Sequence, residues 1–427
     1  MATRRDPRSV TDDLAARFHA TRQLTLDLAA PLSDADATIQ PFPDASPAKW
    51  HLAHVTWFLE TFILRDLGIA PFDERFAYLF NSYYEGEGER LARDRRGMIS
   101  RPNLDAIRDW RTHVDGAIDR ALPTLSPQAL ALVELGIHHE QQHQELFLTD
   151  ILATFASNPL EPAYRHCEEA QPTRQPSGLT AGLPRFARKD EWTSNPGGIA
   201  LIGAGEGAFA FDCEQPRHQT LLHSHDLATR PVSNAEWAEF IADDGYATPN
   251  LWLSEGWDWL RREGIATPLY WHEDGTSFTL AGRIARNPAA PVAHISLYEA
   301  DAFARWAGAR LPREAEWEAA AQLADPRAGQ QLDAFEERGA TATIPAAKST
   351  LFGSVWEWTG SAFLAHPGFA PATGTVGEYN GKFMSGQFVL KGASCATPRG
   401  HSRASYRNFF PPAARWQFTG ARLARDT

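Results

Sequence analysis

Apolar residues recur at helical spacing through the first 160 residues of the chain. Two of these segments open with a serine followed by proline, Ser46-Pro47 and Ser126-Pro127. A capping hydroxyl before proline at the first helical position is a helix-start signal. The segments end at Gly68, before Pro123 or at Asn158-Pro159, residues that interrupt helices. The pattern predicts four helices and therefore a four-helix bundle. They cover approximately residues 11–28, 47–67, 103–122 and 127–157.

The pattern changes from about residue 196 onward. Short β-like runs alternate there with Gly, Pro and Asn, and helical patches are confined to 234–243 and 298–307. This mixture predicts an irregular α+β domain. We therefore expect a helical bundle over 1–160, a linker over 161–195 and an α+β domain over 196–427. The β-like runs are 197–205, 209–218, 219–228 and 387–394.

Composition narrows the class of protein. The 427 residues are 43% hydrophobic and carry a net charge of −12. An acidic chain lacks the basic face that nucleic acid or anionic membrane requires, so neither is an expected partner. Three widely spaced cysteines and a polar N-terminus predict a cytoplasmic protein rather than a secreted one.

Histidines on the apolar stripes are the candidate chemistry. His139 and His143 are four residues apart and share one face of the fourth predicted helix. His54 shares its face of the second helix with Trp50 and Trp57. Buried polar groups need compensating partners, and a metal ion supplies one for imidazoles. Three imidazoles from two helices would leave coordination positions open, as in the facial sites of oxygen-activating iron enzymes. His51 is the other candidate on the second helix, and the role of His138 is open.

A zinc hydrolase is an alternative on local pattern. His139, Glu140 and His143 match H-E-x-x-H, in which the glutamate acts as general base. That reading needs a further ligand, and no second ligand motif follows the helix. It also gives no role to the tryptophan- and histidine-containing second helix.

The two histidine segments, 47–60 and 138–146, together resemble the sulfoxide synthases of ergothioneine biosynthesis. That family joins a DinB-like helical bundle to a domain like formylglycine-generating enzyme, a fold related to C-type lectins. The second half of the chain follows the pattern of the latter enzyme in order. The matching segments are V-S-N-A-E-W-A-E-F, P-V-A-H-I-S-L-Y-E-A, G-S-V-W-E-W-T, V-L-K-G-A-S and T-G-A-R-L.

The resemblance implies iron(II) held by His54, His139 and His143, with O2 as co-substrate. The acceptor would be hercynine, the trimethylated betaine of histidine. Gln142 would lie near its imidazole and Asn408 near its betaine end. Aromatic faces attract a trimethylammonium group. The aromatic residues implied in that contact are Phe409, Phe410 and Trp416.

A catalytic tyrosine is also implied. One branch of the family carries it before the V-L-(R/K)-G segment, where this chain has Phe388. Another branch carries a tyrosine pair in the long loop of the bundle, and Tyr83 and Tyr84 occupy that place. In the same loop, Arg95 and Arg96 are candidates for contacts to the donor substrate.

The donor is a thiol or a selenosugar. Ergothioneine synthases use cysteine or γ-glutamylcysteine, whereas the related selenoneine synthase joins a selenosugar to hercynine. Ser385-Gly386 is a small pair at a position that other members fill with bulkier residues, which would suit a sugar.

Two alternative functions for the second domain have weaker support. Formylglycine-generating activity needs a cysteine pair, and only the distant Cys213 and Cys395 are in that domain, while a non-catalytic binding module would leave the histidines unexplained.

Overall fold

The computed structural model describes residues 7–164, 192–333, 345–346 and 350–427. The chain forms two compact units. The helical unit comprises Met1–Pro159 and a later segment, Ala372–Tyr379. The α+β unit comprises most of the remainder. The predicted fold class, a helical bundle followed by an irregular α+β domain, is confirmed.

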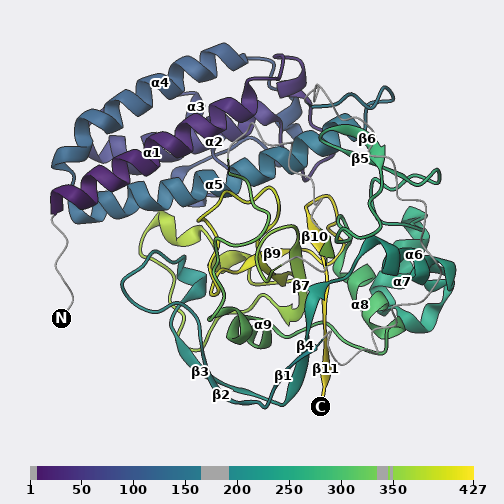
Figure 1. Ribbon diagram of the computed structural model, residues 1–427. Helices are drawn as coiled ribbons and strands as arrows, with labels where there is room; N and C mark the ends of the chain where they lie inside the picture. The colour runs from purple at the N-terminus through teal and green to yellow at the C-terminus, as the bar shows by residue number, and fades with distance from the viewer. Residues whose placement is uncertain (1–6, 165–191, 334–344, 347–349) are drawn as a thin grey trace. The chain divides into compact units, whose positions relative to one another are not determined.

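Four long helices build the helical unit (Figure 1). Helix α2 packs against both α4 and α5, and α1 packs against α5. The second helix does not end at α2, because a π-helical turn and a 3-10 turn continue it to Gly68, whose φ of +75° closes it. The helices are α1 Pro7–Ala29, α2 Ala48–Leu59, α4 Leu104–Ala121 and α5 Pro127–Ala156.

The predicted start signals have different outcomes. Ser126 caps α5 by accepting the Ala129 N–H, with Pro127 as the first helical residue. Asn103 caps α4 in the same way. The prediction that Ser46 caps α2 is wrong, because Pro47 occupies the cap position and the Ser46 hydroxyl instead accepts a hydrogen bond from Arg96. A tertiary contact therefore replaces the local one.

The long connection between α2 and α4 is ordered. It contains helix α3 (Phe76–Phe80) and 3-10 turns at Glu85–Glu87 and Arg93–Met98. Phe76 and Phe80 lie against Trp110 of α4, which fixes α3 on the bundle. The loop can therefore hold side chains in defined places next to α2.

The α+β unit contains two larger sheets and two hairpins. One sheet has the order β1-β4-β11 and the other β10-β7-β8-β9; β2 pairs with β3, and β5 with β6. All pairs are antiparallel except β10 with β7. The strands are β1 Trp192–Asn195, β2 Gly198–Ile202, β3 His218–Leu222, β4 His225–Pro231, β5 Thr276–Thr279, β6 Gly282–Ala285, β7 Trp356–Ala362, β8 Phe388–Gly392, β9 Asn408–Phe410, β10 Thr419–Gly420 and β11 Arg422–Asp426. The helices are α6 Asn234–Ala242, α7 Ser254–Glu263, α8 Leu297–Trp306 and α9 Glu314–Ala321.

Two expectations for this half need correction or qualification. The β-like run at 209–218 forms a 3-10 turn, Asp212–Glu214, because the Glu214 carboxylate accepts the Phe211 N–H that a strand ladder would use. The expected linker over 161–195 lies outside the described residues at 165–191, and its last four residues form β1.

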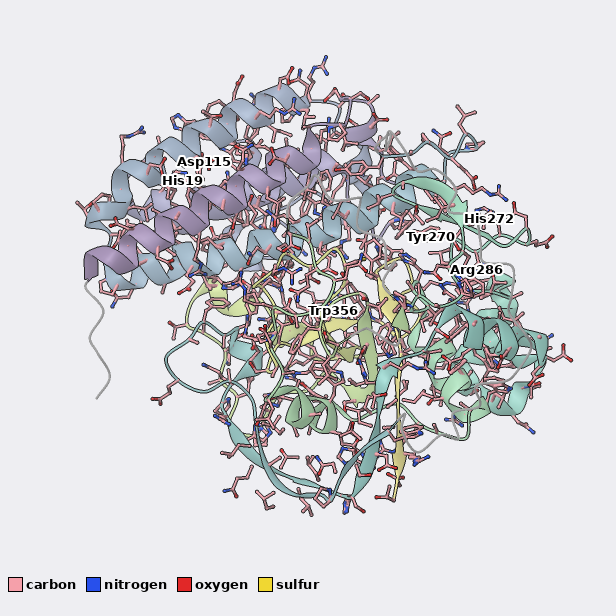
Figure 2. All side chains as sticks on the ribbon, viewed as in Figure 1. His19, Asp115, Tyr270, His272, Arg286 and Trp356 are labelled. Carbon is pink, nitrogen blue, oxygen red and sulfur yellow. The ribbon has the colours of Figure 1, made fainter. Side chains whose placement is uncertain are left out.

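Buried ion pairs stabilise the α+β unit. Glu357 of β7 accepts hydrogen bonds from Arg422 at 2.8 Å and from the Trp317 indole at 2.6 Å. Lys391 of β8 pairs with Glu318 of α9 at 3.0 Å, and both side chains are fully buried. Trp356, at the start of β7, is labelled in Figure 2. The buried pairs Glu357–Arg422 and Lys391–Glu318 thus join the strands and helix of the α+β unit. Among the described helices, none is long and apolar enough to cross a membrane.

Candidate metal centre

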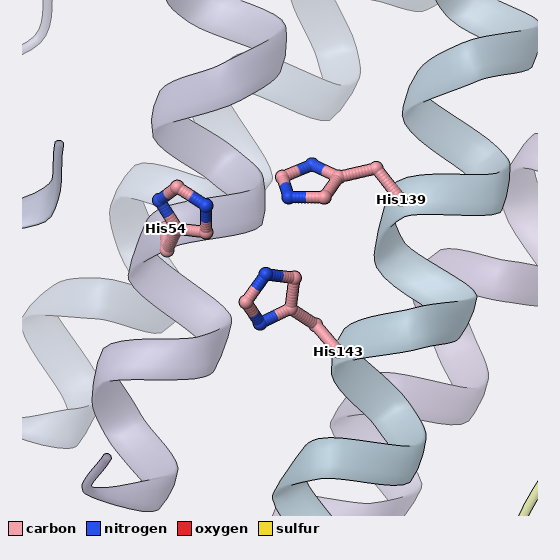
Figure 3. Close-up of side chains that lie close together, drawn as sticks. All are labelled: His54, His139 and His143. Atoms are coloured by element: carbon pink, nitrogen blue, oxygen red, sulfur yellow. The ribbon is translucent and has the colours of Figure 1, made fainter. Parts of the chain in front are cut away.

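Three histidines from α2 and α5 converge within the helical unit (Figure 3). One nitrogen from each of His54, His139 and His143 lies within 4.8 Å of the others. The i,i+4 spacing of the α5 pair places both rings on the side that faces α2. The predicted combination of the three side chains is thus present, although their function as metal ligands stays a prediction.

Aromatic rings and one hydrogen bond fix the plane of His54. Its ring stacks on Trp50 at 4.6 Å and 10° on one side and on Trp57 at 5.5 Å and 17° on the other. Its Nδ1 lies 2.7 Å from the Phe80 carbonyl oxygen. We assign the hydrogen to Nδ1, because a carbonyl only accepts. The lone pair on Nε2 is then directed toward the other two histidines.

The three histidines are held neutral. Burial, followed by the nearby His139, holds the pKa of His54 well below its usual range. Burial, followed by the nearby His139 and His54, also holds the pKa of His143 well below its usual range. Burial lowers the pKa of His139 to about 3. Neutral imidazole is the form that binds metal ions.

Unpaired nitrogens show that the centre fits a metal ion. Within the described part of the chain, His54 Nε2 and both ring nitrogens of His139 are buried without a hydrogen-bond partner. Such groups cost about 1–3 kcal/mol each when left unsatisfied. A cation bound by the three rings would satisfy one nitrogen on each of these two side chains. The donor set, three neutral imidazoles, suits iron, copper, nickel or zinc rather than magnesium or calcium.

The glutamate of the H-E-x-x-H pattern is engaged elsewhere. Glu140 is fully buried and accepts hydrogen bonds from Arg22 at 2.7 Å, from Thr25 at 2.5 Å and from Arg111. Arg22 and Thr25 lie on α1 and Arg111 lies on α4, whereas His54 lies on α2. Burial alone would raise the pKa of Glu140, but the charges of Arg111 and Arg22 outweigh it and lower that pKa. Glu140 is therefore an ionised structural group between three helices. Asp115 of α4, labelled in Figure 2, is a second partner of Arg22 at 2.7 Å.

A segment from late in the chain reaches the centre. The Tyr379 ring lies 5.5 Å from the His139 ring, and its hydroxyl donates a hydrogen bond to Gln142 Oε1. The Glu378 carboxylate accepts the N–H groups of Glu85 and Gly86, each at 3.0 Å, which fixes this segment to the bundle. Sequence reasoning missed Tyr379, because 237 positions separate it from Gln142 and no local motif marks it.

The predicted tyrosine pair, Tyr83 and Tyr84, is separated from the histidines by the ring of Phe58. Tyr84 is fully buried and contacts Phe58, whose ring lies 4.6 Å from His139. Tyr83 stacks on Tyr84 at 4.6 Å and lies 6.3 Å from Tyr379. Burial, with Tyr83 next, raises the pKa of Tyr84 well above its usual range. All three tyrosines thus belong to one aromatic cluster beside the histidines.

The two candidate arginines occupy different environments. Arg96 is buried, its guanidinium lies 3.5 Å from the centre of the Trp50 ring, and it donates hydrogen bonds to Ser46 and Ser82. Arg95 is exposed and contacts the sulfur of Met98. Arg96 therefore supports the tryptophan that stacks on His54. The role of either arginine in binding a donor stays a prediction.

The remaining predicted substrate residues lie in the α+β unit. Asn408, Phe409 and Phe410 form β9, at the edge of the second sheet. Phe409 stacks on Phe363 at 4.1 Å, and Phe410 lies 6.2 Å from Trp416. Ser385 is exposed before β8, next to Gly386 with a φ of +67°. The four aromatic and amide residues are half-buried, as side chains available to a ligand would be, and their roles stay predictions.

Comparisons with known proteins agree with this two-part organisation. A model of the DinB superfamily matches residues 17–147, and one of the sulfatase-modifying factor enzyme 1-like domain matches residues 180–344. Hercynine oxygenase of Mycolicibacterium smegmatis is 33% identical, over 97% of this chain and 99% of its own. Hercynine oxygenase of Mycobacterium tuberculosis is 31% identical with the same coverage. Formylglycine-generating enzyme of Mycobacterium tuberculosis is 27% identical over 40% of this chain and 74% of its own.

Proposed function

Because the chain belongs to the hercynine oxygenase family, we propose that it forms a carbon–sulfur or carbon–selenium bond at the imidazole of hercynine. The single observation that carries this proposal is the convergence of His54, His139 and His143, in which His54 Nε2 and both ring nitrogens of His139 have no hydrogen-bond partner among the described residues. For a thiol donor the reaction balances as hercynine plus thiol plus O2 giving the sulfoxide plus water. The imidazole C–H and the S–H bonds break, O2 is reduced, and no further reductant is required.

The three histidines would hold iron(II), and when bound this ion supplies O2 activation and a site where both substrates meet. The contribution of the protein is positioning. Stacking between Trp50 and Trp57 holds the His54 ring in one plane, so that its nitrogen does not reorient. Three protein ligands would leave coordination positions open to substrates, which an enzyme of this type requires.

Gln142 would bind the hercynine imidazole. It is next to His143 in sequence, and Tyr379 fixes its amide by donating to Oε1. The amide NH2 is then the end that can donate to an imidazole nitrogen. Tyr379, Tyr83 and Tyr84 are the candidate proton donors. Tyr379 is the strongest of the three on its contact with the His139 ring.

From the family resemblance, Asn408, Phe409, Phe410 and Trp416 would contact the betaine end of hercynine. Phe410 and Trp416 offer faces for the trimethylammonium group, and Asn408 offers an amide for the carboxylate. The donor is either cysteine or γ-glutamylcysteine, or a selenosugar. The small Ser385-Gly386 pair would suit a selenosugar, and the hercynine oxygenase relatives support a hercynine substrate without distinguishing the donors, so both donors are carried into the test.

The zinc hydrolase alternative requires Glu140 as general base at the metal. That carboxylate accepts hydrogen bonds from Arg22, Arg111 and Thr25, on the helices α1 and α4. A general base must reach the proton that it removes. The contacts of Glu140 therefore argue against this alternative.

The test is incubation of anaerobically purified, iron(II)-loaded protein with hercynine and O2. Parallel samples contain cysteine, γ-glutamylcysteine or a 1-seleno-sugar, and mass spectrometry follows the products. A hercynine–thiol sulfoxide identifies an ergothioneine-type synthase, and a seleno-sugar adduct with inert thiols identifies a selenoneine synthase. His143→Ala should abolish product, whereas the matched variant His138→Ala, five residues earlier on α5, should retain it. Hydrolysis of a peptide with zinc, and no use of hercynine, would contradict the proposal.

A further inference from the structure

A further histidine of the bundle, His51, contacts His143 and is itself in contact with Asp150. His51 is buried on α2, with its Nδ1 2.9 Å from His143 Nδ1 and its Nε2 3.1 Å from Asp150 Oδ2. The same Asp150 oxygen accepts the Ser46 N–H at 2.7 Å. The three side chains come from two helices: His51 from α2, and His143 and Asp150 from α5. We call Asp150–His51–His143 the relay.

Hydrogen positions in the relay follow from its chemistry. An ionised Asp150 only accepts hydrogen bonds, so we assign a hydrogen to His51 Nε2. A neutral His51 then has a bare Nδ1, which accepts from His143 Nδ1–H. His143 is left with its lone pair on Nε2. Both ring nitrogens of His51 are thus used within the relay, and His51 is not placed to be a metal ligand.

This assignment matches the rest of the centre. His54 donates from Nδ1 to Phe80 and also keeps Nε2 for the metal. Two of the three histidines therefore have their tautomer fixed in the same sense, one by a carbonyl and one by the relay. His139 differs, since within the described residues neither of its ring nitrogens has a hydrogen-bond partner.

We propose that His51 and Asp150 are positioning residues, which fix the tautomer and orientation of His143 and make its Nε2 a stronger donor to the metal ion. The inference rests on the proposed metal centre. A carboxylate that reaches a ligand imidazole directly is a common device, and it raises the basicity of the ligand. Here a second imidazole separates the two, so the negative charge of Asp150 acts on His143 through His51.

The side chains of His51 and Asp150 are both buried, and each is a hydrogen-bond partner of the other. His51 contacts the rings of Trp50 at 5.8 Å and Phe147 at 6.4 Å, and Asp150 is 4% exposed. A buried carboxylate and a buried imidazole each need partners. Each supplies one to the other, Ser46 donates a further hydrogen bond to Asp150, and His143 is a further partner of His51.

The experiment compares three full-length variants with the parent protein. His51→Phe removes both hydrogen bonds of the relay while keeping a ring, and Asp150→Asn keeps an acceptor but removes the charge. His138→Phe is the matched control, because His138 is also a buried histidine of the bundle and its Nε2 lies 3.5 Å from Arg17 instead. Apparent dissociation constants for iron(II) and cobalt(II) are measured by chelator competition without O2. Cobalt(II) absorption bands report the ligand field, which a merely structural role would not change.

We expect His51→Phe to weaken metal binding about 10- to 100-fold, the range found for residues that support metal ligands. Asp150→Asn should shift the cobalt(II) bands and weaken binding less, and His138→Phe should change neither. Equal affinities and spectra for the parent, His51→Phe and Asp150→Asn would overturn the relay while leaving the metal centre intact. If His51→Phe fails to fold, Asp150→Asn decides alone. If the parent protein binds neither ion, the metal centre itself is refuted, and the relay with it.

Discussion

Replacing Glu140 by glutamine separates the structural interpretation of this residue from a catalytic one. Glu140 is the shared partner of Arg22 and Arg111, and all three side chains are buried. The neutral amide removes the negative charge and places an NH2 group against guanidinium donors. Arg22 keeps Asp115, whereas Arg111 retains, among the described residues, its hydrogen bond to the Arg22 carbonyl oxygen at 2.8 Å. One buried cation is then left without its carboxylate.

Breaking a buried ion pair by removing one partner costs about 3–5 kcal/mol. For a unit of this size, 1 kcal/mol corresponds to about 2–4 °C in melting temperature, so the decrease should be about 6–20 °C. The measurement is thermal unfolding of the metal-free protein, followed by circular dichroism at the helical signal. Glu134→Gln is the control on the same helix, because Glu134 forms a half-exposed pair with Arg17 at 2.9 Å. Such exposed pairs contribute about 0–1 kcal/mol.

Metal binding completes the comparison. Folded Glu140→Gln protein should still bind iron(II), because its carboxylate is not among the ligands. The reasoning is refuted if Glu140→Gln and Glu134→Gln melt within about 2 °C of each other. Normal stability and metal binding with no reaction would also refute it, since Glu140 would then take part in the chemistry.

Three further predictions follow from the same contacts. Tyr379→Phe removes the hydrogen bond that orients Gln142, worth about 0.5–1.5 kcal/mol, and should raise the KM for hercynine about 2- to 12-fold; an unchanged KM in steady-state assays would disprove that orientation. Metal-free protein should lose stability as the pH falls from 6.5 toward 3, because the unfolded His139 binds a proton that the folded residue, with its pKa of about 3, excludes; a flat urea-midpoint profile over this range would count against a neutral centre. Arg422→Gln should destabilise the α+β unit by about 3–5 kcal/mol, since it leaves the buried Glu357 without its cation, and calorimetry should show the lower transition.

Local signals predicted much of the bundle correctly. The i,i+4 spacing identified His139 and His143, whereas the pattern of the second helix left both His51 and His54 as candidates, and the family resemblance selected His54, which converges with the other two. Capping by Ser126 was predictable because it depends on residues within three positions. Ser46 shows the limit, since Arg96, 50 positions away, competes for its hydroxyl. The sequence also could not place the partners of Glu140, which come from helices 29 to 118 positions away.

The missed part of the site depends on long-range contacts. The approach of Tyr379 to Gln142 spans most of the chain, and neither residue carries a motif for the other. His51 was recognised as a candidate, but its partners determine its role. Nothing in the sequence distinguishes Asp150 from an ordinary helical aspartate, and its contact with His51 depends on the packing of α5 against α2. Periodicity indicates which face of a helix is buried, and only the packing shows which neighbour that face meets.

The membership of Ala372–Tyr379 in the helical unit has a consequence for synthesis of the chain on the ribosome. The histidine-bearing helices are complete at Ala156, but the tyrosine that contacts His139 is added much later. The interval from Pro159 to Tyr379 is 379 − 159 = 220 residues. At about 5–20 residues per second, it lasts about 11–44 seconds. During that time a nascent bundle can present its three imidazoles without the late segment, so metal capture can precede completion of the site.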